Sequence, residues 1–147
     1  MSSRKGRYPA REVFTVGYEG RDVDELVELL RSRGVRTLVD VRLNAISRKQ
    51  GFSKTLLGER LAEAGITYVH ERELGNPKDN RDGYRAGNVS AHKRFARHLE
   101  RNGADAVERV AQLVRSTPTS LLCVEREAHS CHRTAVADQL GISVVSL

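Results

Sequence analysis

The sequence contains no apolar run long enough to cross a membrane, because its longest stretches of consecutive apolar residues cover only a few positions. The first eleven residues, MSSRKGRYPAR, lack the apolar segment of a secretory signal. The 147 residues include only two cysteines, too few for a disulfide framework. We therefore expect a cytoplasmic protein with no membrane contact and with both thiols free.

Sequence motifs for common cofactors are also missing. The chain has no GxGxxG dinucleotide fingerprint and no Walker motif, and the GYEG stretch at 17–20 is too short to be either. Nothing in the sequence therefore supports binding of NAD or ATP, and no cofactor is expected.

Basic residues exceed acidic ones, which gives a net charge of +6. Four basic residues lie within the first eleven positions, and the remaining 21 basic and 19 acidic residues nearly balance. We therefore expect residues 1–11 to form a flexible basic arm and residues 12–147 to form a single α/β domain. The arm is either a solvated tail or a contact for nucleic acid.

Strand-like segments alternate along the chain with helices whose apolar residues recur at helical spacing. Asp22, Ser53 and Ser90 are expected to cap helices, with Glu25 completing a capping box behind Asp22. Residues 74–88 are rich in Gly, Asn and Asp, which predicts a long loop of the kind that forms a mobile lid. The expected strands are 12–17, 35–42, 66–71, 120–125 and 142–147, and two further helices are expected at 104–115 and 131–140.

This alternation predicts a compact α/β fold, with a mostly parallel sheet of about five strands and helices on both faces. In such sheets, ligands bind outside the carboxyl ends of the strands. The polar residues at the expected strand ends are Tyr18, Glu19, Asp40, Arg42, His70, Glu71, Cys123 and Glu125. Asp40 interrupts an apolar strand, where a charge needs either a catalytic use or a buried partner such as Arg42.

The stretch CVEREAHSCHR contains both cysteines of the chain. Cys131 is expected at the start of a helix, where the helix dipole and the neighbouring His132 and Arg133 favour a thiolate. The same helix start and Arg133 suit a bound phosphate or carboxylate equally well. Glu125 is either a general base or a partner of Arg133, and Cys123 is either a resolving thiol or a small core residue.

Two other ligand types are suggested by residue clusters. Cys123, His129, Cys131 and His132 are possible zinc ligands, but without a CxxC pair their spacing argues against a metal site, and none is expected. The stretch SRKQGFSK at 47–54 predicts a second anion site, in which Ser53 and Lys54 open a helix. Phe52 in this stretch is either a stacking face for a base or a core side chain.

These motifs together resemble a known family. TVGYEG, LVDVR, the GFSK helix start, GITYVH followed by ELGNP, and LLCVE with a later CHR are similar to the bacterial and archaeal family called domain of unknown function 488. The resemblance covers residues 13–145 and implies a compact α/β fold without naming a reaction. It places the polar signature residues of the family at Tyr18, Glu19, Asp40, Arg42, Cys123, Glu125, Cys131, His132 and Arg133.

Three functional hypotheses follow from these patterns. The first is an enzyme, a hydrolase or a transferase, that acts on a nucleotide or nucleic-acid base. Asp40, Glu19 or Glu125 would then be catalytic, and Arg42, Arg133 and Lys54 would hold phosphates. The second is a thiol enzyme or redox sensor that uses Cys131 with Cys123. The third is a non-catalytic nucleic-acid-binding module that uses the basic arm and the loop at 42–54.

Overall fold

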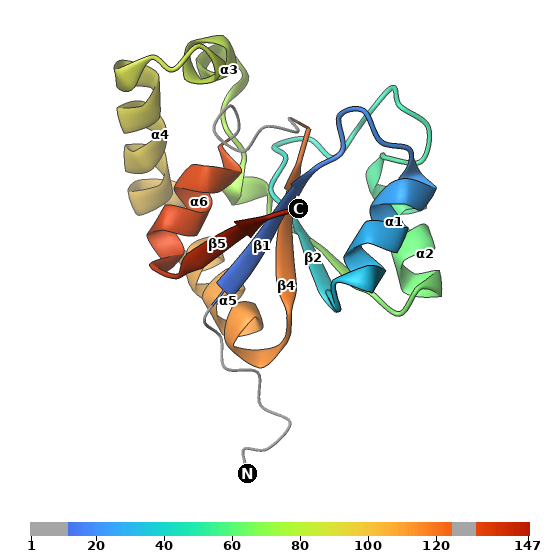
Figure 1. Cartoon of the computed structure of the whole chain (residues 1–147). Coiled ribbons are helices and arrows are strands. Elements are labelled where there is room, and N and C mark those ends of the chain that lie inside the picture. The colour runs from blue at the N-terminus through green and yellow to red at the C-terminus, as the bar shows by residue number, and fades with distance from the viewer. Residues whose placement is uncertain (1–11, 125–131) are drawn as a thin grey trace.

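A five-stranded parallel sheet forms the centre of the computed structural model, which describes residues 12–124 and 132–147. The strand order is β3-β2-β4-β1-β5, and every neighbouring pair is parallel. The strands are β1 (Glu12–Gly17), β2 (Thr37–Asp40), β3 (Thr67–His70), β4 (Thr119–Cys123) and β5 (Ser143–Ser146). The predicted α/β class with five parallel strands is therefore confirmed (Figure 1).

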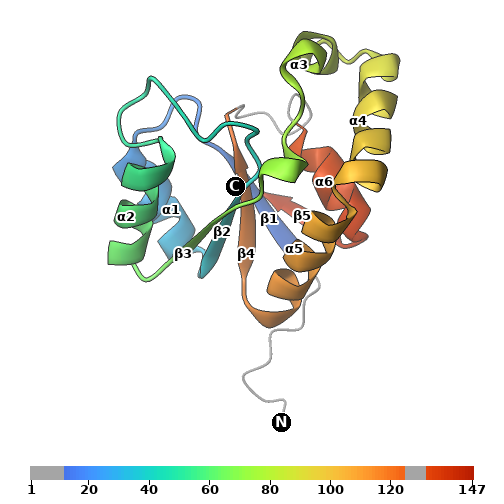
Figure 2. The same cartoon turned by 180° about the vertical axis from the view of Figure 1, so that it is seen from behind.

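Helices cover both faces of this sheet. The helices are α1 (Val23–Ser32), α2 (Lys54–Glu63), α3 (Lys78–Arg85), α4 (Val89–Asn102), α5 (Ala104–Ser116) and α6 (Arg133–Leu140), with a 3-10 turn, η1, at Arg72–Leu74. Helices α1 and α2 pack on one face and α4, α5 and α6 on the other, while α3 lies near the carboxyl edge of the strands (Figures 1 and 2). The buried apolar residues form two clusters, one on each face.

Local sequence signals explain several of these elements. The side chain of Asp22 accepts a hydrogen bond from the Glu25 amide, and the Glu25 side chain accepts one from the Asp22 amide, so the predicted capping box is present. Helix α1 then buries Leu26, Val27 and Leu30, which share one face of the helix at the spacing that predicted it.

The expected loop at 74–88 is wrong, because the structure contains η1 and helix α3 there. Contacts with α4 stabilise α3 in spite of its poor helix formers. The side chain of buried Asn80 donates to Asn76 and to the carbonyl of Ala91. The Tyr84 ring stacks on His92, with centroids 3.8 Å apart.

One expected helix start is also displaced. Helix α4 is capped by Asn88, whose side chain accepts from the Ala91 amide, and not by Ser90. Helix α6 begins at Arg133 after His132, while the expected start at Cys131 lies outside the described residues.

The strand order brings distant segments together at one edge of the sheet. The helix that follows β2 in the chain, α2, packs on one face of the sheet, whereas the helix that follows the neighbouring β4, α6, packs on the other (Figure 2). Diverging connections of this kind open a crevice at the carboxyl ends of parallel strands. Within the described ranges, no helix is both long and apolar enough to cross a bilayer.

Candidate functional site

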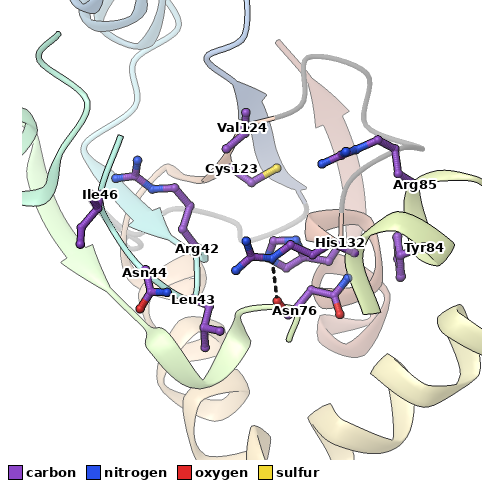
Figure 3. Close-up of a pocket in the computed structure, with 11 residues that line it drawn as sticks. Arg42, Leu43, Asn44, Ile46, Asn76, Tyr84, Arg85, Cys123, Val124 and His132 are labelled. Carbon is purple, nitrogen blue, oxygen red and sulfur yellow. Dashed lines mark hydrogen bonds between the residues drawn. The ribbon is translucent and has the colours of Figure 1, made fainter. Parts of the chain in front are cut away.

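A cavity of about 170 Å³ lies at the carboxyl ends of β2 and β4. Figure 3 shows the side chains around it, with Arg85 extending from α3 toward Cys123 and Val124. Its described lining consists of Arg42, Leu43, Asn44, Ile46, Asn76, Arg81, Tyr84, Arg85, Cys123, Val124 and His132. The cavity therefore joins the loop after β2, the end of β4, the α3 segment and the start of α6.

Gly75 allows the α3 segment to approach the loop after β2. A Cβ atom at Gly75 would lie 2.3 Å from the Cα atom of Leu43, which is backbone and cannot rotate away. The absence of this atom lets Asn76 and α3 lie directly across the cavity from the end of β2. The ELGNP motif thus contributes to the shape of the site as well as to a turn.

Asp40 is fully buried behind the cavity and is surrounded by hydrogen-bond donors. The guanidinium of Arg42 donates to both carboxylate oxygens, through Nε at 2.8 and 3.0 Å and through Nη2 at 2.6 Å. The hydroxyl of Tyr68 donates to Oδ2 at 2.6 Å, and the backbone amide of Arg42 donates to Oδ1 at 3.0 Å. Arg42 is therefore the buried partner of Asp40, as one of the two interpretations of the sequence expected, and Tyr68 is a second hydrogen-bond donor to it.

The Arg42 guanidinium is held on its other side as well. Its Nη1 donates to the carbonyl of Phe52 at 2.7 Å and lies 3.4 Å from the hydroxyl of Tyr18. Burial lowers the pKa of Arg42, but the hydrogen bonds and charge of Asp40 outweigh it, so that the pKa is raised overall. Arg42 is thus a fixed cation whose charge Asp40 compensates.

Tyr18 and Phe52 pack behind Arg42 as a pair of stacked rings. Their centroids are 4.3 Å apart, and both rings are buried. Of the two readings of Phe52, the structure therefore supports the core side chain, because a fully buried ring offers no face to a base.

Two histidines hold the backbone that follows β2. His132 Nε2 lies 2.7 Å from the carbonyl oxygen of Val41, and His70 Nε2 lies 2.7 Å from that of Arg42. A carbonyl oxygen can only accept, so in each ring Nε2 carries the proton. His132 also contacts Phe95 edge to face, with centroids 5.4 Å apart, which fixes its ring in the cavity wall.

Cys123 brings a sulfur atom to the cavity. Nη1 of the fully buried Arg133 donates to its Sγ at 3.0 Å. Cys123 is disulfide-bonded, so the expectation of free thiols is wrong for this residue. The spacing of two cysteines along a chain does not decide whether they are bonded, because that depends on how the fold brings them together. Cys131 and Glu125 lie outside the described residues.

The described lining of the cavity is cationic. Its described residues include Arg42, Arg81 and Arg85 and no Asp or Glu. Arg81 Nε donates to the carbonyl of Asn76 at 3.1 Å, and Arg85 lies 3.8 Å from the exposed carboxylate of Asp82. His132 is the N-cap residue of α6, so the positive end of that helix dipole also faces the cavity wall.

Three other expected site residues lie outside this lining. Glu19 is exposed, and its backbone amide donates to the carbonyl of Val124 at 2.9 Å. Ser53 precedes α2 but does not cap it through its side chain, because its hydroxyl bonds the backbone of Ser47. Lys54 is exposed at the first position of α2.

Glu71, another residue at an expected strand end, is a buried carboxylate that forms an ion pair with a half-exposed arginine. Arg109 of α5 donates to both of its carboxylate oxygens, at 2.9 and 2.7 Å. These hydrogen bonds and the charge of Glu71 raise the pKa of Arg109. The pair joins the end of β3 to α5 and lies apart from the described lining of the cavity.

Sequence reasoning missed the cavity residues of the α3 segment, namely Asn76, Arg81, Tyr84 and Arg85. The spacing of Arg81 and Arg85, four residues apart, would place both on one face of a helix. This signal was present in the sequence, but the surrounding Gly and Asn residues favoured a loop.

The zinc hypothesis receives no support from the described part of the chain, where no group of three potential ligands is close enough to hold a metal ion. Two of the four residues considered, His129 and Cys131, lie outside that part. The fold and the cavity define a parallel α/β protein with a cationic cavity at the carboxyl edge of its sheet.

Within this class, one family model matches the chain. It is the family described as domain of unknown function DUF488, and the match covers residues 22–140. The chain therefore belongs to the DUF488 family, as the resemblance of its motifs predicted. No curated protein and no solved structure is similar enough to the chain to count as a match.

Proposed function

We propose that the protein is an enzyme, a hydrolase or a transferase, that acts on a phosphate-bearing substrate bound in the cavity. One observation carries this proposal: the described lining holds three arginines and a histidine but no carboxylate. A lining of this composition attracts an anion and repels a cation. The planar donor fork of arginine also matches the oxygens of a phosphate.

The residues of the cavity divide into those that bind and those that hold the binding groups in place. Arg81 and Arg85 are the proposed phosphate ligands, because they line the cavity and lie on one face of α3. Asp40 positions Arg42 at the cavity wall through three guanidinium contacts. His132 is the proposed proton donor or acceptor, since its ring is fixed at the wall.

This assignment changes the expected role of Asp40. Its oxygens already accept hydrogen bonds from Arg42 and Tyr68, and its side chain is not exposed to solvent. A carboxylate in this setting orients a cation more readily than it receives a substrate proton.

The test is calorimetric titration with inorganic phosphate and with a nucleoside monophosphate, in the wild type and in Arg81→Gln. Loss of a charge-assisted hydrogen bond removes about 1.5–3 kcal/mol, so affinity should fall about tenfold or more. The matched control is Arg115→Gln, an exposed arginine at the end of α5 that pairs with Glu108. Unchanged affinity in Arg81→Gln, or an equal loss in the control, would refute the proposal.

A second candidate function is thiol chemistry at Cys123, and the position of Arg133 favours it. A guanidinium 3.0 Å from sulfur is a poor match for a disulfide, which accepts hydrogen bonds weakly, but it stabilises a thiolate strongly. Two-electron reduction by a dithiol would open the disulfide to two thiols and would oxidise the dithiol to its own disulfide. The sulfur of Cys123 would then be a thiolate at the cavity wall.

The reduction potential of the disulfide tests this candidate. Equilibration of the protein with dithiothreitol buffers should give a more oxidising potential in the wild type than in Arg133→Met, since Arg133 stabilises the reduced form. An equal or lower potential in the wild type would show that the arginine serves packing alone. A circular dichroism spectrum of both proteins establishes that the variant is folded.

A further inference from the structure

Helix α4 carries a stripe of basic side chains that the proposed phosphate site does not use. Lys93, Arg97 and Arg101 follow one another at intervals of four residues, and all three are exposed. They project from one side of the helix, about 6 Å apart along its axis. The opposite side of α4 is buried, so the stripe faces away from the core.

The positive charge of residues 12–147 is concentrated in this region. Residues 78–102 contain seven basic and three acidic side chains, a net charge of +4. The rest of residues 12–147 contains 14 basic and 16 acidic side chains, a net charge of −2. Residues 12–147 are therefore nearly neutral in total, but α3 and α4 are basic and the rest of these residues is slightly acidic.

Other helices compensate their arginines with neighbouring carboxylates. Arg31 pairs with Glu28 on α1, and Arg115 pairs with Glu108 on α5. On α2, Arg60 pairs with Glu63 and with Asp24. Within the described ranges, the three residues of the α4 stripe form no ion pair, although Arg94 beside them pairs with Asp79. Glu100 lies three residues after Arg97 on the same helix, so the side of α4 that carries the three cations keeps an excess of positive charge without an ion pair.

The helix that carries the stripe packs against the helix that lines the cavity. Helix α3 contributes Tyr84 and Arg85 to the cavity lining and packs against α4. His92 of α4 lies 3.0 Å from the carbonyl of Tyr84, which joins the two helices directly. Figure 1 shows α4 running from α3, at the carboxyl edge of the sheet, down the side of the molecule. An extended polyanion held in the cavity could pass over α3 and follow α4.

We propose that the substrate is a single-stranded nucleic acid, whose backbone lies along the α4 stripe while one of its nucleotides enters the cavity. This inference rests on the proposed phosphate site and names the substrate class for it. Positively charged surfaces that track the phosphate backbone are one of the features by which proteins bind a single strand. A cavity of about 170 Å³ admits a phosphate group or one base and is too small for a base pair within a duplex.

A membrane surface fits the stripe less well. Helices that lie in the membrane interface expose large apolar side chains beside their basic ones. The large apolar residues within α4, Phe95 and Leu99, are instead buried in the core. Its one exposed apolar side chain, Val89, stands at the first position of the helix.

The experiment measures binding of a fluorescein-labelled 20-nucleotide single-stranded DNA by fluorescence anisotropy, at several salt concentrations. The test variant of the full chain is Lys93→Gln/Arg97→Gln/Arg101→Gln, which changes only the outer side of α4. Three lost phosphate contacts should reduce the slope of log affinity against log salt by about 2 units. Affinity should fall about 100-fold at 0.1 M salt.

Two control variants identify the source of any loss. Arg31→Gln/Arg60→Gln/Arg115→Gln removes the same charge from other helices and should bind nearly as the wild type does. An equal loss in this control would overturn the inference, because attraction would then reflect net charge alone. A variant with the four basic residues of positions 1–11 changed to Gln should retain most of the affinity, and loss confined to that variant would also overturn the inference.

Two further measurements separate this inference from the proposed function. The stripe variant should bind inorganic phosphate as the wild type does, because α4 does not line the cavity. Phosphate binding in the cavity without stripe-dependent DNA binding would overturn this inference and leave the proposed function standing. Stripe-dependent DNA binding without phosphate binding would overturn the proposed function, and with it the entry of a nucleotide into the cavity, and would leave the α4 stripe as a nucleic-acid contact only. Preferential stripe-dependent binding to phosphatidylserine vesicles would overturn the assignment to nucleic acid.

Discussion

Replacement of Asp40 by asparagine should destabilise the fold strongly, because Asp40 compensates a buried cation. The variant keeps the size of the side chain but removes its charge and points an amide toward the guanidinium of Arg42. Both side chains of this pair are almost fully buried, at 0% and 5% exposure. Breaking such a pair costs about 3–5 kcal/mol, a large part of the 5–15 kcal/mol by which domains are stable.

Urea denaturation followed by far-ultraviolet circular dichroism measures this cost, since the chain has no tryptophan for a fluorescence signal. With a slope near 2 kcal/mol per molar urea, the midpoint should fall by about 2 M. The matched control is Asp24→Asn, whose 77%-exposed carboxylate pairs with Arg60 and should contribute less than about 1 kcal/mol. A midpoint for Asp40→Asn close to that of the wild type would refute the structural role and would return Asp40 to the list of catalytic candidates.

Three further predictions concern the packing around the site. Gly75→Ala should lower the free energy of unfolding, measured by urea denaturation, by about 3 kcal/mol, because its Cβ would overlap the Leu43 backbone. The control Gly34→Ala, where the Cβ would lie in open space at φ +75°, should cost about 1 kcal/mol. Equal costs would contradict the close approach of Gly75 to Leu43. Burial, with the charge of Asp138 as a second cause, raises the pKa of Tyr84 to about 12. The contribution of neutral Tyr84 to stability is complete below the unfolded pKa near 10 and is lost as pH rises toward 12. The free energy of unfolding of the wild type should therefore fall by about 2–3 kcal/mol more than that of Tyr84→Phe across this range. The same pH dependence of stability in both proteins would contradict the raised pKa of Tyr84. Glu71→Gln should lower the free energy of unfolding by about 1–3 kcal/mol, because it removes a buried carboxylate that accepts two hydrogen bonds from Arg109. A loss no larger than that of Glu63→Gln, whose carboxylate is exposed, would contradict this role of Glu71.

The elements that the sequence predicted well are those whose signals are local. The capping box of Asp22 and Glu25 begins α1 at the expected residue, and the apolar spacing of α1 and α5 follows their buried faces. Short strand-like segments that alternate with helical patterns predicted all five strands. These features depend on residues that are only a few positions apart in the sequence.

The features that sequence reasoning missed depend on distant partners. Helix α3 forms because Asn80 bonds the backbone of α4 and Tyr84 packs on His92, and neither contact can be read from residues 74–88. The cavity exists because β4 lies beside β2 in the sheet, so that Cys123 approaches the loop after Arg42. Spacing along the chain therefore indicated the edge of the sheet but not which side chains meet there.

Locating a bound phosphate analogue by anomalous X-ray diffraction is the most direct test of the central claim, which is that the cationic cavity binds the substrate. Crystals soaked in tungstate, whose metal scatters anomalously, would reveal every anion site without any assumption about the reaction. We predict the strongest anomalous peak inside the cavity, within hydrogen-bonding distance of Arg81 and beside His132. Peaks confined to other surfaces, with none in the cavity, would contradict the claim.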